Sequence, residues 1–100
     1  MKPSQVLQEQ HDRIVAIMRE HARLSNLRVF GSVARGEDTD ASDIDFVVDP
    51  APHTTLLDLA GLRLDLQGLF GPYRIKVDLA TPRALPKRAR EQILSEAKPV

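Results

Sequence analysis

VFGSVARGEDTDASDIDFVV, residues 29–48, combines two short strand patterns with a turn and a polar connection between them. The first strand pattern ends at Gly31, and the chain turns at Ser32 into a short helical segment. The second pattern opens with Asp43 and Asp45, whose side chains project to the same face because successive residues of a strand alternate. We expect the rest of the chain to be organised around this stretch.

The paired carboxylates predict a metal site. Asp43 and Asp45 would repel each other strongly if nothing compensated their charges. The usual compensation is a divalent cation bound by carboxylate oxygens. Gly31 lets the backbone approach a ligand closely, and the helix N-terminus at Ser32 presents free N–H groups that suit a phosphate. Carboxylates, a metal and a phosphate together indicate nucleotide chemistry.

The composition favours one small folded domain. The chain has 100 residues, and 42% of them are hydrophobic. Lys plus Arg and Asp plus Glu balance at 14 each, so we expect no direct DNA binding and no attraction to a membrane. Cysteine is absent, which excludes disulfides and thiolate metal sites and fits a cytoplasmic protein. No apolar run approaches membrane-spanning length.

The spacing of apolar residues predicts the main elements of the chain. Ser25 and Asn26 are expected to form a turn, and Asp49 with Pro50 should end the second strand. The leucine stripe of the second long helix is expected to be core, and its exposed margin is a candidate partner surface. The predicted helices are residues 4–23, 54–70 and 87–97, and the predicted strands are residues 27–30, 43–48 and 73–79.

The third predicted strand adds a third carboxylate. Asp78 lies on the polar face of this strand, with Arg74 and Lys76, which we expect to be solvated. If the strand pairs beside the second one, Asp78 can reach a metal held by Asp43 and Asp45. Three carboxylates from neighbouring strands can hold two magnesium ions, one orienting a triphosphate and one activating an attacking hydroxyl.

These motifs resemble those of a known family. Gly31-Ser32 followed by Asp43-x-Asp45 resembles the signature of the nucleotidyltransferase superfamily that includes DNA polymerase beta and kanamycin nucleotidyltransferase. With the small size, the chain resembles the minimal nucleotidyltransferase (MNT) proteins, the antitoxins of HEPN–MNT toxin–antitoxin pairs. The resemblance covers nearly the whole chain, so residues 1–100 are expected to form one such domain. The further matching stretches are Ala34-Arg35-Gly36, Ser42-Asp43-Ile44-Asp45, Val77-Asp78-Leu79 and Ile93-Leu94-Ser95-Glu96-Ala97.

The resemblance implies an α/β (α+β) fold, with a mixed sheet of about four strands packed against helices. It implies ATP as substrate and Mg²⁺ or Mn²⁺ as metal. It also implies a HEPN-domain ribonuclease as partner in a hetero-oligomer, since family members transfer AMP to a tyrosine of that toxin. By residue, Asp43, Asp45 and Asp78 match the metal-binding and catalytic carboxylates, and Gly31 and Ser32 match the nucleotide-phosphate loop.

The sequence leaves two alternative roles open for each of four charged residues near this loop. Arg35 either steadies a phosphate or forms an exposed ion pair. Glu37, Asp38 and Asp40 either face solvent or lie close to the triphosphate.

Three functions fit these observations. The chain could be a protein adenylyltransferase, a contact antitoxin with a slow or idle nucleotide site, or a free-standing transferase that modifies a small molecule such as an antibiotic. Three convergent acids favour the first function, because neutralisation by contact alone does not require them. The third is the weakest, since 100 residues leave no second domain to shape an acceptor pocket.

Overall fold

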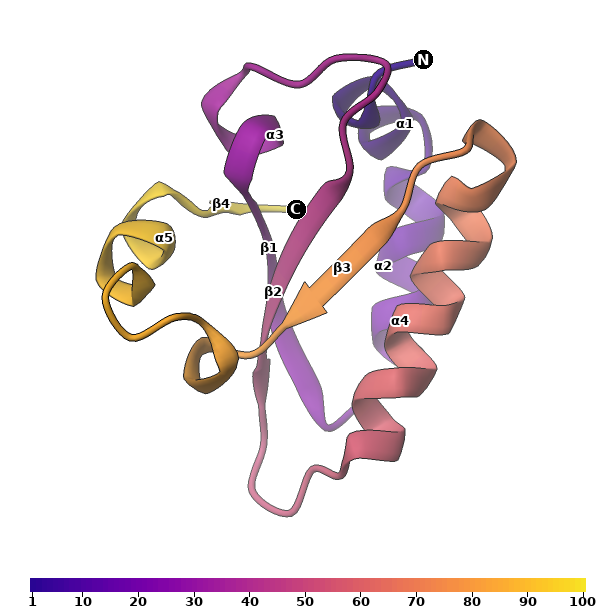
Figure 1. The fold of residues 1–100 in the computed structure, drawn as a ribbon. Coiled ribbons are helices and arrows are strands. Elements are labelled where there is room, and N and C mark those ends of the chain that lie inside the picture. Colours follow the sequence, from indigo (N-terminus) through magenta and orange to yellow (C-terminus); the bar gives the residue numbers. More distant parts are fainter.

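A mixed four-stranded sheet with the order β3-β2-β1-β4 forms the centre of the computed structural model, which covers residues 1–100 (Figure 1). The strands are β1 (Leu24–Phe30), β2 (Ile44–Pro50), β3 (Val77–Ala80) and β4 (Lys98–Pro99). β1 pairs antiparallel with both β2 and β4, while β3 lies parallel to β2. The predicted α/β (α+β) class with a mixed sheet of four strands is therefore confirmed.

Helices lie on both sides of this sheet. Figure 1 shows α2 and α4 on one side and α5 on the other, and α3 follows β1 directly. None of the helices has the length and apolar character needed to cross a bilayer. The helices are α1 (Pro3–Glu9), α2 (His11–Glu20), α3 (Gly31–Arg35), α4 (Leu56–Phe70) and α5 (Arg90–Glu96), and the 3-10 turns are η1 (Gly71–Tyr73) and η2 (Pro82–Ala84).

The main core lies between the sheet and the helices α2 and α4. Ile44, Phe46 and Val48 alternate along β2 and are fully buried in this core. The ring of Phe46 meets the ring of Phe70 edge to face, with 5.9 Å between their centroids. Burial of each of these large side chains contributes about 1.5–3 kcal/mol to stability. The same alternation directs the intervening residues of β2 to the opposite face.

The opposite face of β2 is covered at one end and open at the other. Val47 is fully buried on this face, where η2 contacts β2 and α5 contacts β1. Leu85, directly after η2, is also buried. Asp45, nearer the start of β2, is only half-buried. The polar end of this face is therefore accessible from solvent.

The prediction of one continuous helix over residues 4–23 was wrong, because the structure has two helices there, α1 and α2, which meet at Gln10. Gln10 has φ −95° and ψ 9°, which is not helical. The i to i−4 hydrogen bonds continue across the break, from Gln10 N–H to Val6 O and from Ile14 N–H to Gln10 O. A straight helix would place Val6 and Ile14 about 80° apart around its axis, since each residue turns the chain by about 100°. The bend lets both side chains reach the core, where both are buried.

The turn predicted at Ser25 and Asn26 was also wrong, because both residues belong to β1. The register with β2 shifts between Ser25 and Arg28, as in a β-bulge. Asn26 has φ 55°, a left-handed conformation that asparagine tolerates better than most residues. Its side-chain amide donates to Asp49 Oδ2 at 3.0 Å. The turn signal therefore marks a bulge inside a longer strand.

The third strand is shorter than the predicted range 73–79. Tyr73 belongs to η1, and Arg74 has φ 60°, so the chain is still turning at these positions. β3 begins only at Val77. The prediction that Arg74 shares a strand face with Asp78 is therefore wrong, although Arg74 is exposed as expected.

Prolines shift the limits of two further elements. β2 continues through Pro50, which pairs in register with Leu24, because a residue at the end of a strand needs no ladder N–H. The last helix does not begin at residue 87, since a turn follows Pro86 and α5 starts at Arg90. The long helix predicted at 54–70 begins at Leu56.

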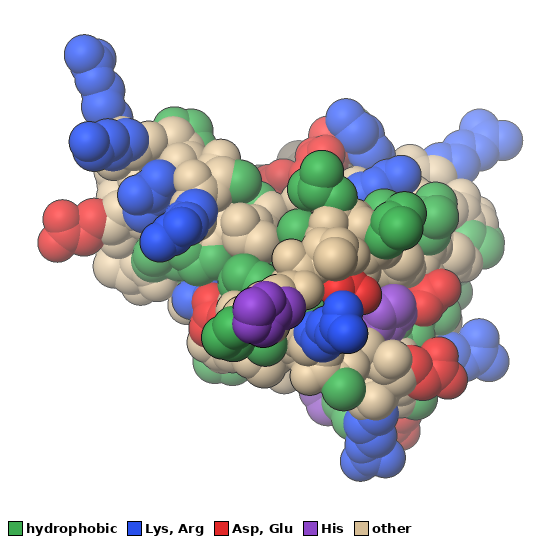
Figure 2. Space-filling model, turned by 90° about the horizontal axis from the view of Figure 1, so that it is seen from below, with side chains coloured by type: hydrophobic (Ala, Val, Ile, Leu, Met, Phe, Trp, Pro, Cys, Tyr) green, Lys and Arg blue, Asp and Glu red, His purple; other side chains and the backbone are tan.

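Basic side chains and exposed leucines gather in different parts of the molecule. Figure 2 shows Lys and Arg side chains gathered over η2 and α5, at the end of the molecule that faces the viewer. Three exposed leucines, in contrast, all lie on α4: Leu56 is 84% exposed, Leu57 83% and Leu64 60%. Most of the leucine stripe is core, as predicted, but these three side chains face solvent.

Candidate functional site

The turn from β1 into α3 lies directly against the carboxylate of Asp45. Gly31, the first residue of α3, has φ +70°, a left-handed conformation that favours glycine. A Cβ atom built on Gly31 would lie 2.5 Å from Asp45 Oδ2, which is closer than real Cβ atoms approach. Only glycine at this position leaves that side of the carboxylate open.

Asp45 and Asp78 are direct neighbours across the two parallel strands. They are register partners in the β2–β3 ladder, and both side chains project from the face opposite the main core. The carboxylate of Asp78 remains 47% exposed, and Lys76 Nζ lies 3.6 Å from its Oδ1. Lys76 is solvated as expected, but it also touches the site, which sequence reasoning did not predict.

Burial raises the pKa of Asp45, and the negative charges of Asp78 and Asp43 raise it further. A hydrogen bond between the side chains of Asp45 and Asp78 acts in the same direction, while the positive charge of Arg35 opposes these effects. The start of β2 is therefore a place of concentrated negative charge. A bound cation would relieve this repulsion.

Asp43 lies at the rim of the site rather than in its centre. It precedes the first residue of β2 and is exposed, yet its charge is close enough to raise the pKa of Asp45. No three Asp, Glu, His or Cys side chains lie close enough together to form a metal site by themselves. The oxygen donors nevertheless fit Mg²⁺, which commonly takes only one or two carboxylates and completes its shell with water and phosphate oxygens.

Of the two roles considered for Arg35, the structure contains the ion pair. Its Nε lies 3.1 Å from Glu37 Oε1, and one terminal nitrogen lies 3.7 Å from Glu96 Oε2. The side chain is 45% exposed, so these contacts contribute little to stability. The second contact connects α3 to the end of α5, beside the open end of the sheet.

The acidic residues after α3 have partners of their own. Asp38 is 7% exposed, and its Oδ2 accepts a hydrogen bond from the backbone N–H of Ser4 at 2.8 Å. It therefore stabilises the first turn of α1, a role that sequence reasoning missed. A sequence signal for this role was available: the first turn of α1 contains no acidic residue, so its free N–H groups need an acceptor from elsewhere in the chain. Glu37 pairs with Arg35, and Asp40 lies 3.8 Å from the N-terminal amine.

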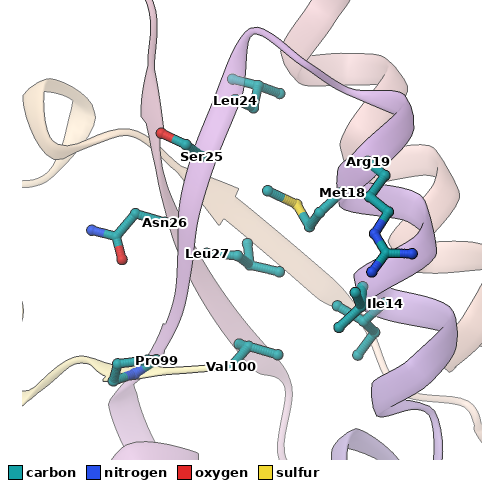
Figure 3. Close-up of a pocket in the computed structure, with 10 residues that line it drawn as sticks. Ile14, Met18, Arg19, Leu24, Ser25, Asn26, Leu27, Pro99 and Val100 are labelled. Atoms are coloured by element: carbon teal, nitrogen blue, oxygen red, sulfur yellow. The ribbon is translucent and has the colours of Figure 1, made fainter.

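The aspartates lie on an open surface rather than in a hollow. A hollow of about 400 Å³ lies between α2, β1 and the C-terminal residues, and Ile14, Met18 and Leu27 point into it (Figure 3). It belongs to the side of the sheet that carries the main core, away from Asp45. The other two hollows do not include Asp43, Asp45 or Asp78 either. A bound nucleotide would therefore leave room for a large acceptor.

Comparisons with known proteins point to one kind of chemistry. Residues 11–100 match the family model described as "Nucleotidyltransferase domain". "Putative protein adenylyltransferase MJ0435" of Methanocaldococcus jannaschii is 33% identical over 85 residues, which span 85% of this chain and 87% of that protein. A structure described as "putative minimal nucleotidyltransferase" is 44% identical with a TM-score of 0.76, covering 94% of this chain and 95% of the other. A crystal structure of a toxin–antitoxin with AMP-PNP is 25% identical with a TM-score of 0.66, covering 88% and 69%.

Proposed function

Because this chain belongs to the nucleotidyltransferase domain family, we propose that it is an antitoxin that transfers AMP from ATP to a partner toxin. The chain is thus a nucleotidyltransferase, and the acceptor that we propose is a tyrosine hydroxyl of a cytoplasmic HEPN-domain ribonuclease. The observation that carries this proposal is the pairing of Asp45 with Asp78 beside Gly31, on a surface open to a second protein.

The relatives support the donor, the reaction and the type of partner. One similar protein is named as a protein adenylyltransferase, and one similar structure is a toxin–antitoxin with an ATP analogue. The open position of the aspartates also favours an acceptor that arrives on another protein, because this chain has no pocket around them. Adenylylation of a bound toxin satisfies all of these observations.

In this proposal Asp45 and Asp78 hold the divalent metal from neighbouring strands, and Asp43 completes the site from its rim. When bound, Mg²⁺ or Mn²⁺, as one or two ions, supplies charge stabilisation for the attacking and leaving oxygens. Gly31 keeps the backbone close to the ligand, Ser32 donates its N–H and hydroxyl to a phosphate oxygen, and Arg35 supplies nearby positive charge. These roles follow from residue type and position.

The transfer itself is a substitution at the α-phosphorus of ATP. The tyrosine oxygen forms a bond to this phosphorus, the bond to the bridging oxygen of the β-phosphate breaks, and pyrophosphate leaves. Asp78 is the candidate acceptor of the tyrosine proton, because its side chain is 47% exposed and can meet an acceptor that arrives on another protein. Asp45 stays against Gly31 and positions the other side of the site.

The test is co-expression of the cognate toxin with the wild-type chain, with Asp78→Asn, or with the control Asp12→Asn on the exposed side of α2. We expect an adenylyl mass shift on the toxin and loss of its RNase activity with the wild type and the control. With Asp78→Asn both should disappear while the chain stays folded. Full protection by Asp78→Asn without an adenylyl group would instead establish a contact antitoxin.

A further inference from the structure

The side chain of Gln67, on α4, makes two hydrogen bonds to the backbone just before β3. Its Nε2 donates to the carbonyl of Ile75 at 2.9 Å, and its Oε1 accepts from the N–H of Val77 at 2.9 Å. Both contacts are partly buried. A single amide group thus pairs with a carbonyl and an N–H that are two residues apart, immediately before Asp78.

This pairing replaces a missing strand neighbour. β3 is at the edge of the sheet and has only β2 beside it. On the β2 side, the N–H of Ile44 donates to Lys76 O at 3.0 Å. The carbonyl of Ile75 and the N–H of Val77 point to the other edge, because backbone groups alternate along a strand. The amide of Gln67 satisfies both groups there, so the backbone of residues 75–77 is held from two sides.

α4 provides a rigid base for this amide. Leu66 and Phe70, on either side of Gln67 in the sequence, are fully buried in the core. Phe70 O also accepts a hydrogen bond from Ile75 N at 3.3 Å. Figure 1 shows that α4 runs alongside β3, and the two elements are in contact. A displacement of Gln67 would therefore need a displacement of the core helix.

We propose that Gln67 is a positioning residue that sets Asp78 in register with Asp45. Asp78 follows Val77 directly, so its carboxylate depends on the backbone that Gln67 holds. The inference rests on the proposed role of Asp78 in metal and nucleotide binding. Errors of about 1 Å in the position of a reacting group can cost about 100-fold in rate. A side chain that does not touch the ligand can therefore control the chemistry.

Two substitutions separate the two hydrogen bonds. Gln67→Met keeps the length of the side chain but removes both the donor and the acceptor. Gln67→Glu keeps the acceptor for Val77 N–H and loses the donor to Ile75 O when the new carboxyl is ionised. At acid pH that carboxyl regains a proton, so the stability difference between Gln67→Glu and the wild type should narrow. Gln8→Met, on the exposed side of α1, is the control.

The measurements are amide hydrogen exchange by NMR, calorimetry with Mn²⁺ and a non-hydrolysable ATP analogue, and AMP transfer to the toxin. In Gln67→Met we expect faster exchange at Val77 and Asp78, about 10- to 100-fold weaker binding of the metal–nucleotide complex, and a similar loss of transfer. Gln8→Met should behave as the wild type in all three.

Two results would overturn the inference. Unchanged exchange at Val77 and Asp78 in Gln67→Met would show that the amide does not hold this backbone. Faster exchange with unchanged binding and transfer would reduce the contact to a structural one, provided that Asp78→Asn does abolish binding. If Asp78→Asn binds the metal–nucleotide complex as the wild type does, the proposed function of Asp78 has failed, and the inference about Gln67 fails with it.

Discussion

Gly31 and Gly36 form a natural pair for testing the contact with Asp45. Both have left-handed backbones, with φ +70° and +72°, but a Cβ at Gly36 would meet no atom within 4 Å. Alanine at either position should lower the free energy of unfolding by about 1–2 kcal/mol through backbone strain.

Gly31→Ala should in addition displace the Asp45 carboxylate and abolish binding of Mn²⁺ with ATP. Chemical denaturation and calorimetry measure the two effects. Equal losses of binding in Gly31→Ala and Gly36→Ala would show that the contact with Asp45 has no role.

The raised pKa of Asp45 predicts that this residue lowers the free energy of unfolding by an amount that depends on pH. The folded protein binds a proton at Asp45 more readily than the unfolded chain does, because burial and the charges of Asp78 and Asp43 disfavour the carboxylate. Ionised Asp45 therefore destabilises the fold at neutral pH, and this cost vanishes below the ordinary carboxyl pKa of about 3.9.

Replacement of Asp45 by asparagine should then stabilise the chain without metal. We expect Asp45→Asn to have a higher Tm than the wild type at pH about 7, where the carboxylate is ionised. The difference should shrink as the pH falls through the raised pKa. Asp12→Asn, which removes an exposed charge on α2, controls for the change in net charge. A constant difference across the pH range would contradict the assigned repulsion.

Sequence reasoning at the level of single residues worked where local geometry decides the outcome. Strand alternation is a local rule, so it separates Asp45 from the core residues Ile44 and Phe46. The partner of Asp38, in contrast, is the distant backbone N–H of Ser4, and the first turn of α1 signals only that an acceptor is missing there, not which residue supplies it. The hydrogen-bond partners of Gln67 could not be predicted from the sequence either, because they follow from the packing of α4 on β3.

At the level of elements, the segments richest in core residues were predicted best. α4 and β2 contain long runs of core residues, so tertiary contacts reinforce their intrinsic patterns. β3 was placed too early because the alternation of residues 73–79 continues from η1 into the strand. β4 has only two residues and carries no periodic signal, so only the family resemblance implied a fourth strand.

The strand pattern of residues 73–79 predicts which face of β3 carries Asp78, but not which residue of β2 lies opposite it. A shift by one residue would exchange the two faces of the strand and bury Asp78 in place of Val77. The buried side chains of Ile75 and Val77 and the hydrogen bonds from Gln67 select the observed register. An element of four residues thus depends on a helix for the position of its functional side chain.

At the level of the whole molecule, the chain is neutral but its surface is divided. Exposed cations follow one another on η2 and in the segment between η2 and α5, namely Arg83, Lys87 and Arg88. Arg83 lies near Asp49 and Pro50, at the end of β2 away from Asp45. α4, on the other side of the sheet, has an outer face without charge along Leu57, Ala60 and Leu64. An uncharged outer face that carries largely exposed leucines favours a protein partner over this face.

This division predicts which variants separate partner binding from catalysis. Leu57 and Leu64 are two turns apart on α4 and both are largely exposed. We expect the double substitution Leu57→Asn and Leu64→Asn to weaken the complex with the toxin about ten-fold or more, because each exposed leucine would bury apolar area at an interface. The substitutions remove no core side chain, so binding of Mn²⁺ with ATP should stay as in the wild type, while Tm should fall slightly because asparagine has a lower helix propensity than leucine. Size-exclusion chromatography with calorimetry against the toxin measures the complex, and Ala16→Asn on the exposed side of α2 is the control. An unweakened complex would place the toxin on another surface and leave the apolar face of α4 without this role.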